Sequence, residues 1–231
     1  MNQLELQNIS KKYKTKQVLE PLSLVIEEGE CLVLCGGNGA GKSTLLSIIA
    51  GVLRPSSGSV LLNDCCLQHN RKPYVEQIGY MPDDFQADPS MTVKEFLLFY
   101  ASLRKIDLSR VEEMLVLIGL QEQRNVRITR LSKGMRQRLL FGQAWLAKPA
   151  LILLDEPTNG LDPYWVNVFV QQIKEIKNSG SIVIFSTHMM DVAVETADRI
   201  LLMKAGNVMD QLTELSSKEE VVMELIKLQR I

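Results

Sequence analysis

Three continuous apolar runs in the C-terminal half of the chain indicate the fold class. Residues 151–154, 182–185 and 200–203 contain only apolar side chains, which is typical of strands that are covered on both faces in a parallel sheet. They alternate with segments of helical periodicity, such as residues 166–177. A fourth apolar run, Cys31–Cys35, predicts another buried strand. The pattern predicts an α/β fold whose core is a parallel sheet flanked by helices.

Alternating apolar positions near the N-terminus predict a second, antiparallel sheet. Two segments carry the alternation, and residues 60–62 are expected to extend the same sheet. The apolar positions of these two segments are Leu4, Leu6 and Ile9 in the first and Val18, Leu22, Leu24 and Ile26 in the second. We therefore expect an N-terminal antiparallel β lobe beside the parallel core.

From about residue 86 to residue 147 the pattern changes to that of helices. Thr92 with Glu95 and Ser109 with Glu112 have the spacing of capping boxes before two apolar helical segments. This stretch predicts a helical lobe inserted into the core. Because the sequence contains no low-complexity linker or internal repeat, we expect residues 1–231 to form a single domain.

The last segment, from about residue 217 to residue 230, has the spacing of an amphipathic helix. Its apolar positions Val221, Val222, Leu225 and Leu228 share one face. Two interpretations remain open at this point. The helix covers its own domain, or it holds two copies of the chain together without a ligand.

Composition narrows the class of protein. The chain has 231 residues, 46% of them hydrophobic, and a formal net charge of -1, so nothing in its overall charge predicts binding to nucleic acid or to an anionic membrane. It has no apolar run long enough to span a bilayer and no signal sequence at its start. The four cysteines form no disulfide framework, and Cys65, Cys66 and His69 make a poor metal site because adjacent strand residues face opposite ways. We expect a cytosolic protein with reduced thiols.

One glycine-rich segment carries the clearest chemical signal. It has the spacing Gly-x-x-x-x-Gly-Lys-Ser, directly after a predicted strand and before a predicted helix. In such a loop the backbone N–H groups and the helix dipole face a polyphosphate, the lysine contacts its β and γ phosphates, and the serine hydroxyl binds Mg²⁺. The predicted nucleotide-binding residues are Gly36, Gly37, Asn38, Gly39, Ala40, Gly41, Lys42, Ser43 and Thr44.

A second chemical signal follows the apolar strand at residues 151–154, which ends in two adjacent carboxylates. Asp155 at the end of the strand is placed to hold Mg²⁺ together with Ser43. Glu156, one residue later, can accept a proton from a water molecule that attacks the γ phosphorus. The sequence thus predicts ATP and Mg²⁺ as ligands and Glu156 as a catalytic base.

The segment Leu131-Ser132-Lys133-Gly134-Met135-Arg136-Gln137-Arg138 makes the chain similar to ATP-binding cassette (ABC) ATPases. It resembles the signature segment of that family, and the resemblance extends over nearly the full length of the chain. It implies that Ser132 and Gly134 contact the γ phosphate of a nucleotide bound to a second cassette. Each ATP would then lie between the phosphate loop of one copy and the signature of another.

Other positions agree with this family in chain order. Tyr13 corresponds to the aromatic residue that stacks on adenine, residues 159–163 to the loop that links the two sites, and His188 to the histidine that contacts the γ phosphate or the attacking water.

The chain also departs from the family pattern at three positions. Asp83 stands where the family usually has a glutamine that contacts Mg²⁺ and water, and Lys133 and Met135 replace the commoner glycine and glutamine. Asp83 is expected to be a catalytic and metal-binding residue, although its shorter side chain puts the metal geometry in question.

The resemblance implies two classes of function. The first is the motor subunit of a membrane transporter, which lies on the cytoplasmic side of the membrane and acts on separate transmembrane permease subunits. The second is a soluble cassette ATPase that acts on a macromolecular partner. The compact helical segment between Ser43 and Leu131, without a coiled-coil insertion or a second cassette, favours the first. The signature is similar to those of exporters, including the ATPase of nitrous oxide reductase maturation transporters.

Overall fold

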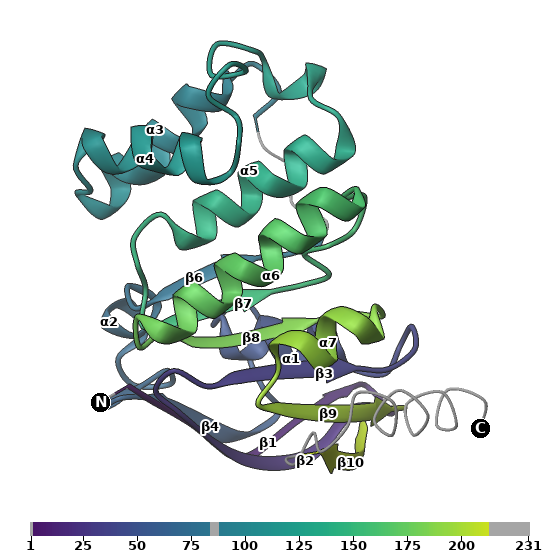
Figure 1. Cartoon of the computed structure of the whole chain (residues 1–231). Helices are drawn as coiled ribbons and strands as arrows, with labels where there is room; N and C mark the ends of the chain where they lie inside the picture. Colours follow the sequence, from purple (N-terminus) through teal and green to yellow (C-terminus); the bar gives the residue numbers. More distant parts are fainter. Residues whose placement is uncertain (1, 84–87, 213–231) are drawn as a thin grey trace.

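The structure is a computed structural model, and it describes residues 2–83 and 88–212. Its strands form two sheets (Figure 1). The first is a four-stranded antiparallel sheet in the order β2-β1-β4-β5, and the second has six strands in the order β10-β9-β3-β8-β7-β6. The first sheet consists of β1 (Gln3–Tyr13), β2 (Lys16–Glu27), β4 (Ser57–Leu62) and β5 (Cys65–Cys66). The second consists of β3 (Cys31–Cys35), β6 (Ile78–Met81), β7 (Leu151–Leu154), β8 (Ile182–Ser186), β9 (Arg199–Lys204) and β10 (Asn207–Leu212).

The helices cover both sheets and link their strands (Figure 1). Among the described residues they are α1 (Lys42–Ile49), α2 (Arg71–Val75), α3 (Val93–Arg104), α4 (Leu108–Leu117), η1 (Ile128–Arg130), α5 (Lys133–Trp145), α6 (Pro163–Asn178) and α7 (Met190–Thr196). Helix α1 packs between the two sheets, whereas α5, α6 and α7 pack on the other face of the six-stranded sheet.

The predicted parallel core and antiparallel lobe are both confirmed. β3 pairs in parallel with β8 and β9, and β7 pairs in parallel with β6 and β8. β1 pairs antiparallel with β2 and β4. The edge strand β10, which pairs antiparallel with β9, was not among the predicted strands.

The apolar runs are buried on both faces because alternate residues enter two different cores. In β3, Leu32 and Leu34 join the core that contains α1 and the antiparallel sheet. Val33 and the two cysteines at the ends of β3 join the core formed with helices α3 to α7. All five residues of β3 are buried. The glycine-rich loop begins directly after the strand, where the chain leaves the sheet.

The predicted helical region contains α3, α4 and α5, drawn in teal at the top of Figure 1. The capping box of Thr92 and Glu95 is confirmed at the start of α3. The corresponding prediction for Ser109 and Glu112 is wrong, because α4 begins at Leu108 and its N-cap is Asp107, whose side chain accepts a hydrogen bond from the Ser109 amide. An aspartate two residues earlier competes successfully for the cap position.

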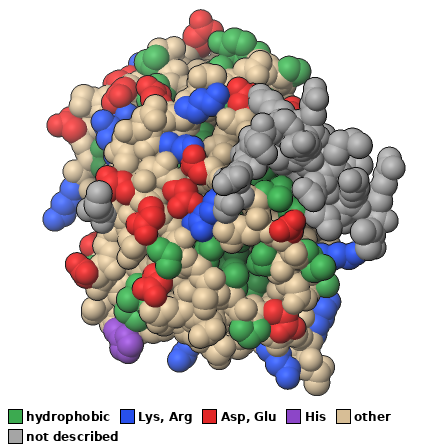
Figure 2. Space-filling view, turned by 60° about the horizontal axis from the view of Figure 1, so that its bottom comes forward, with side chains coloured by type: hydrophobic (Ala, Val, Ile, Leu, Met, Phe, Trp, Pro, Cys, Tyr) green, Lys and Arg blue, Asp and Glu red, His purple; other side chains and the backbone are tan. Residues whose placement is uncertain are grey.

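The helix expected at residues 217–230 lies outside the described residues, as do residues 86 and 87 at the start of the expected helical lobe. No helix among residues 2–83 and 88–212 is long and apolar enough to cross a bilayer. On the face drawn in Figure 2, acidic and basic side chains lie next to each other rather than in separate blocks.

The parallel pairing determines where polar residues gather. Because β6, β7, β8 and β3 run in the same direction, the segments that follow them leave the sheet at the same edge. These segments carry Asp83, Asp155, His188 and the glycine-rich loop. The fold therefore brings residues far apart in sequence to one edge of the sheet.

Candidate functional site

The glycine-rich loop follows β3 directly and ends in the first turn of α1. Gly41 is the N-cap of α1 and has no side chain that could accept a hydrogen bond from the first-turn amides. The first turn also contains no acidic residue. Amides at the start of a helix have no partner within the helix, and with the helix dipole they favour an anion. The loop therefore fits a phosphate group.

Lys42 lies at the centre of this edge. It is 7% exposed, and its ammonium group donates hydrogen bonds to the carbonyl oxygens of Gly36 at 2.6 Å and Gly37 at 3.4 Å. Its Nζ is also 3.9 Å from Oε1 of Glu156. Ser43 and Thr44 follow it in the first turn of α1, where Ser43 is exposed. A buried ammonium group with carbonyl and carboxylate partners is a strong donor for a polyphosphate.

The two carboxylates after β7 have different surroundings. Asp155 is buried, its amide donates to the Met81 carbonyl at 2.8 Å, and its Oδ1 accepts a hydrogen bond of 2.6 Å from the Ser186 hydroxyl. Glu156 has a φ of 49°, in the left-handed region that side chains other than glycine adopt at a cost. Its amide donates to the Ser186 hydroxyl at 2.9 Å. Because of this backbone turn, the Asp155 carboxylate contacts the buried Ser186 hydroxyl, whereas the Glu156 carboxylate lies near Lys42 and His188.

Glu156 is surrounded by potential hydrogen-bond donors. Its Oε2 lies 2.9 Å from Nδ1 of His188, whose side chain is 62% exposed. The Glu156 carbonyl accepts a hydrogen bond of 2.8 Å from the side-chain amide of Gln137. Thus the predicted base and the predicted histidine are in direct contact, and helix α5 fixes the backbone of the base.

Sequence reasoning missed Ser186 and Gln137 as parts of this arrangement. Ser186 is 0% exposed at the end of an otherwise apolar strand, and Gln137 is a buried amide in α5. A polar residue that ends a buried run is the signal that could have singled out Ser186. No comparable signal in the sequence identifies Gln137.

Ser186→Ala is expected to lower the free energy of unfolding by about 1–3 kcal/mol, because the buried Asp155 carboxylate loses its hydroxyl donor. Chemical denaturation measures this. The matched control is Ser181→Ala, since the Ser181 hydroxyl makes a buried hydrogen bond of 2.8 Å to the neutral Pro149 carbonyl. The Ser181 change should cost less and leave ATP hydrolysis intact. Equal costs for the two variants would contradict the role given to Ser186.

Asp83 follows β6 at the same edge, and its Oδ1 accepts a hydrogen bond of 3.4 Å from the Asn159 side chain. Within the described parts of the chain, no cluster of three or more His, Cys, Asp and Glu side chains could hold a metal ion. Mg²⁺ commonly takes only one or two protein carboxylates and completes its shell with phosphates and water. The carboxylates of Asp155 and Asp83 and the hydroxyl of Ser43 supply oxygen atoms of the kind that Mg²⁺ takes, and their part in holding a metal stays a prediction.

Ser132 and Gly134 lie at the start of α5. Ser132 is the N-cap, and its hydroxyl accepts a hydrogen bond of 3.2 Å from the Met135 amide. A Cβ atom on Gly134 would lie 2.6 Å from the Gly160 carbonyl oxygen, so packing against the turn at residues 159–162 already requires glycine there. These contacts are with α5 and that turn rather than with the phosphate loop.

Tyr13 ends β1 and is 48% exposed. The ammonium group of Lys11 lies 4.8 Å from the centroid of its ring. An exposed ring of this kind can stack on a base, and its assignment to adenine remains a prediction.

Comparison with known sequences decides the family. A family profile described as ABC transporter matches residues 19–159. The chain belongs to the ABC transporter family. An uncharacterized ABC transporter ATP-binding protein of Bacillus subtilis, YdbJ, is 36% identical over 209 residues, which are 89% of this chain and 67% of that protein. The Nod factor export ATP-binding protein I of Rhizobium etli is 31% identical over 210 residues, covering 89% of this chain and 66% of that protein. The chain thus spans about two thirds of the length of these relatives.

Solved structures of ABC cassettes have the same fold. The ATP-binding subunit of an ABC transporter superposes with a TM-score of 0.87 at 28% identity, covering 96% of this chain and 99% of that one. A cassette solved as a dimer in a post-hydrolysis state with ADP and Pi gives a TM-score of 0.81 at 28% identity, covering 91% and 98%. This ABC protein is accordingly an ATP-binding subunit of a transporter, and it hydrolyses ATP, as the sequence predicted.

Proposed function

We propose that two copies of this ABC subunit, or one copy and a related cassette, close head to tail around two ATP molecules. In this arrangement each ATP lies between the phosphate loop of one copy and Ser132 and Gly134 of the other. The observation that carries the proposal is the division of the predicted site. Lys42, Glu156 and His188 are brought together at one edge of the sheet, whereas Ser132 presents an exposed helix start elsewhere.

Binding is assigned to the loop and the first turn of α1. The γ and β phosphates take the place of the Gly36 and Gly37 carbonyls as partners of the Lys42 ammonium group. Amides of residues 36–44 donate to the phosphate oxygens, and Tyr13 stacks on the adenine ring. Ser132 of the second copy adds a hydroxyl donor and a helix start to the γ phosphate.

Hydrolysis is assigned to Glu156 and His188. Glu156 accepts a proton from water while the water oxygen forms a bond to the γ phosphorus, and the bond between that phosphorus and the bridging oxygen breaks to release ADP. His188 donates from Nδ1 to Oε2 of Glu156 and orients the carboxylate; with a second proton, on Nε2, the ring also donates to the γ phosphate. Mg²⁺, held by Ser43, Asp155 and Asp83, would neutralise charge on the phosphates.

The mechanical output is assigned to the surface formed by α3 and α4. There the cassette pair pushes on separate transmembrane permease subunits, so the protein lies at the cytoplasmic side of the membrane without entering it. Export is the favoured direction, in line with the Nod factor export protein among its relatives. The nature of the cargo depends on the permease.

The test of the shared site is Ser132→Asp, compared with Ser132→Asn. Both replacements cap a helix well, so α5 should be kept. The aspartate places a negative charge opposite the γ phosphate of the second copy, and we expect ATP-driven dimerisation to be lost and hydrolysis to fall by about 100-fold or more.

Binding of ATP to the separate Ser132→Asp subunit should equal that of the unmodified protein, because its phosphate loop is intact. Ser132→Asn should keep most of the activity. Light scattering for dimerisation and phosphate release for hydrolysis measure the two effects. Hydrolysis at the normal rate by the aspartate variant would refute the shared site.

A further inference from the structure

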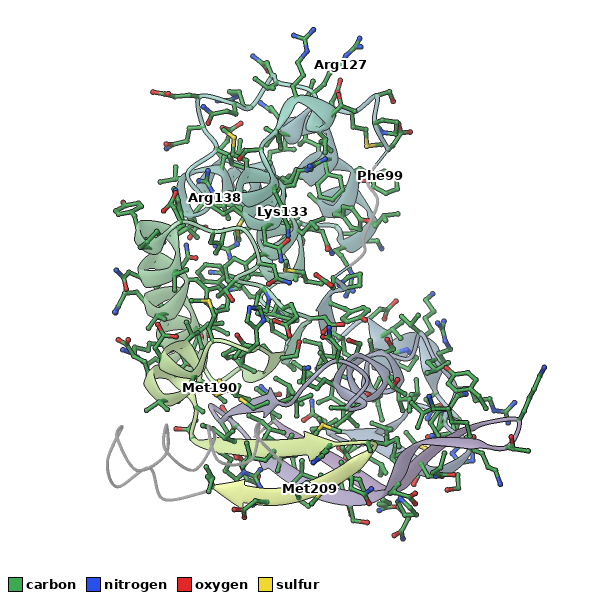
Figure 3. All side chains as sticks on the ribbon, turned by 90° about the vertical axis from the view of Figure 1, so that its right-hand side faces the viewer. Phe99, Arg127, Lys133, Arg138, Met190 and Met209 are labelled. Carbon is green, nitrogen blue, oxygen red and sulfur yellow. The ribbon has the colours of Figure 1, made fainter. Side chains whose placement is uncertain are left out.

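Arg138 lies in the middle of α5, and the proposed function gives it no role. The carbon atom at the centre of its guanidinium group is 3.7 Å from the ring centroid of Trp165. Its Nη1 donates hydrogen bonds to the carbonyl oxygens of Ile118 at 2.8 Å and Gly119 at 3.1 Å. One side chain thus joins the signature helix, the end of α4 and the start of α6. Arg138 and Lys133, which belong to the same helix, are labelled in Figure 3.

The turn after α4 is shaped to this stack. Gly119 has a φ of 61°, and a Cβ atom there would lie 2.2 Å from the Trp165 ring and 3.0 Å from Nη1 of Arg138. Only a glycine allows the backbone to approach both groups so closely. The three partners therefore form one tightly packed unit.

This unit is continuous with the catalytic segment. The backbone amide of Trp165 donates to Oδ1 of Asp162, the N-cap of α6, at 3.0 Å, so the backbone that carries the ring is held to the end of the segment that follows Glu156. Arg138 and Trp165 line the same small cavity, of about 10 Å³, as Pro157 and Leu161. Its lining also includes Gln137, whose amide holds the Glu156 carbonyl.

Burying the charged guanidinium group of Arg138 at this position costs desolvation free energy. Burial lowers the pKa of Arg138, although the nearby Asp162 carboxylate partly opposes this. Its Nε is buried and has no hydrogen-bond partner among the described residues. An apolar side chain of similar volume often serves stability equally well at such a site. The planar stack and the two fixed donors instead define the direction and distance between the joined segments.

We propose that Arg138 and Trp165 are positioning residues that hold α5 against the start of α6, and thereby set the position of Ser132 relative to residues 156–162 of the same subunit when two ATP-loaded copies close. The signature that one copy offers to its partner is then aligned with the base of that same copy in the closed pair. This inference rests on the proposed shared site. It predicts that the pair governs how tightly two ATP-loaded subunits close.

The test uses the full chain carrying Glu156→Gln, in which hydrolysis does not interfere. Adding Arg138→Met, which removes the charge and the planar stack, should weaken ATP-driven dimerisation at least 10-fold. The affinity of the separate subunit for ATP should stay within 2-fold, because the phosphate loop is untouched. Trp165→Phe keeps an aromatic face and should weaken dimerisation by less than 3-fold. A purely structural role would not separate dimerisation from ATP binding in this way.

The matched control is Arg110→Met. Arg110 also faces a tryptophan, at 5.4 Å from Trp145, and donates to the carbonyls at the far end of α5. Its hydrogen bonds go to Trp145 and Leu146 and its ion pair to Glu113, so its loss should lower the melting temperature without weakening dimerisation of the folded protein. Equal dimerisation by the Arg138→Met variant and its parent would overturn the inference.

If Arg138→Met does not fold, Arg138→Lys decides the matter, because it keeps the charge but lacks the planar stack and the paired donors. Weakened dimerisation of this variant supports the inference, and unchanged dimerisation overturns it. If the Glu156→Gln parent itself fails to dimerise with ATP, the proposed function falls and the inference falls with it. The two failures are therefore distinguishable.

Discussion

Glu156→Gln is expected to lower the rate of ATP hydrolysis by about 100-fold to 10,000-fold, the range found for loss of a general base. Glutamine keeps the size of the side chain and can still contact His188, but it cannot accept the proton of the attacking water. By the relation between rate and barrier, the loss corresponds to about 3–5 kcal/mol of transition-state stabilisation. Phosphate release under saturating ATP measures it.

ATP binding should survive this change, because the phosphate loop and Lys42 are unaltered. The ATP-loaded pair should therefore persist and be visible as a dimer by size-exclusion chromatography. Glu195→Gln is a suitable control, since that carboxylate is paired with Lys174 at 3.2 Å away from the proposed site. A Glu156→Gln variant that hydrolyses ATP as fast as the control would show that another group is the base.

Lys42→Ala is expected to weaken ATP binding by about 100-fold or more, equivalent to about 2.7 kcal/mol. The ammonium group is buried and already directed at the loop, so a phosphate gains a charge-assisted donor at little cost in ordering. Titration with a fluorescent ATP analogue measures the affinity.

Folding of the Lys42→Ala variant should be little affected, because the carbonyls of the loop can be solvated and Glu156 keeps its contact with His188. Lys174→Ala removes a half-exposed lysine that pairs with Glu195 and should leave the affinity for ATP unchanged. Similar ATP affinities for the two lysine variants would remove Lys42 from the proposed site.

The strands of the parallel core were predictable because both of their faces are buried. Leu151–Leu154 and Cys31–Cys35 are entirely apolar, and the structure has strands with those bounds. The edge strand β10 gives no such signal, since most of the side chains of Asn207–Leu212 are exposed and, among the described strands, β9 alone pairs with it. The position of β10 depends on its pairing with β9. The apolar period of a single segment does not reveal which strand it pairs with.

The site was predictable to the extent that its chemistry is local. The phosphate loop, Asp155 and Glu156 each follow a strand within a few residues, so spacing alone was enough to select them as candidates. Ser186 and Gln137 act through contacts across the fold, with Asp155 and Glu156 on neighbouring segments. Such contacts depend on which strands lie side by side, and a single sequence does not specify that order.

The most direct measurement of the shared site mixes two inactive variants, Lys42→Ala and Ser132→Asp. Each pure variant should hydrolyse almost no ATP, because every site contains one defective half. In a mixed dimer the intact phosphate loop of the Ser132→Asp copy meets the intact signature of the Lys42→Ala copy, so one of the two sites is complete. We predict that mixing restores a substantial fraction of the activity. Activity that stays at the level of the pure variants, although mixed dimers form, would contradict the account.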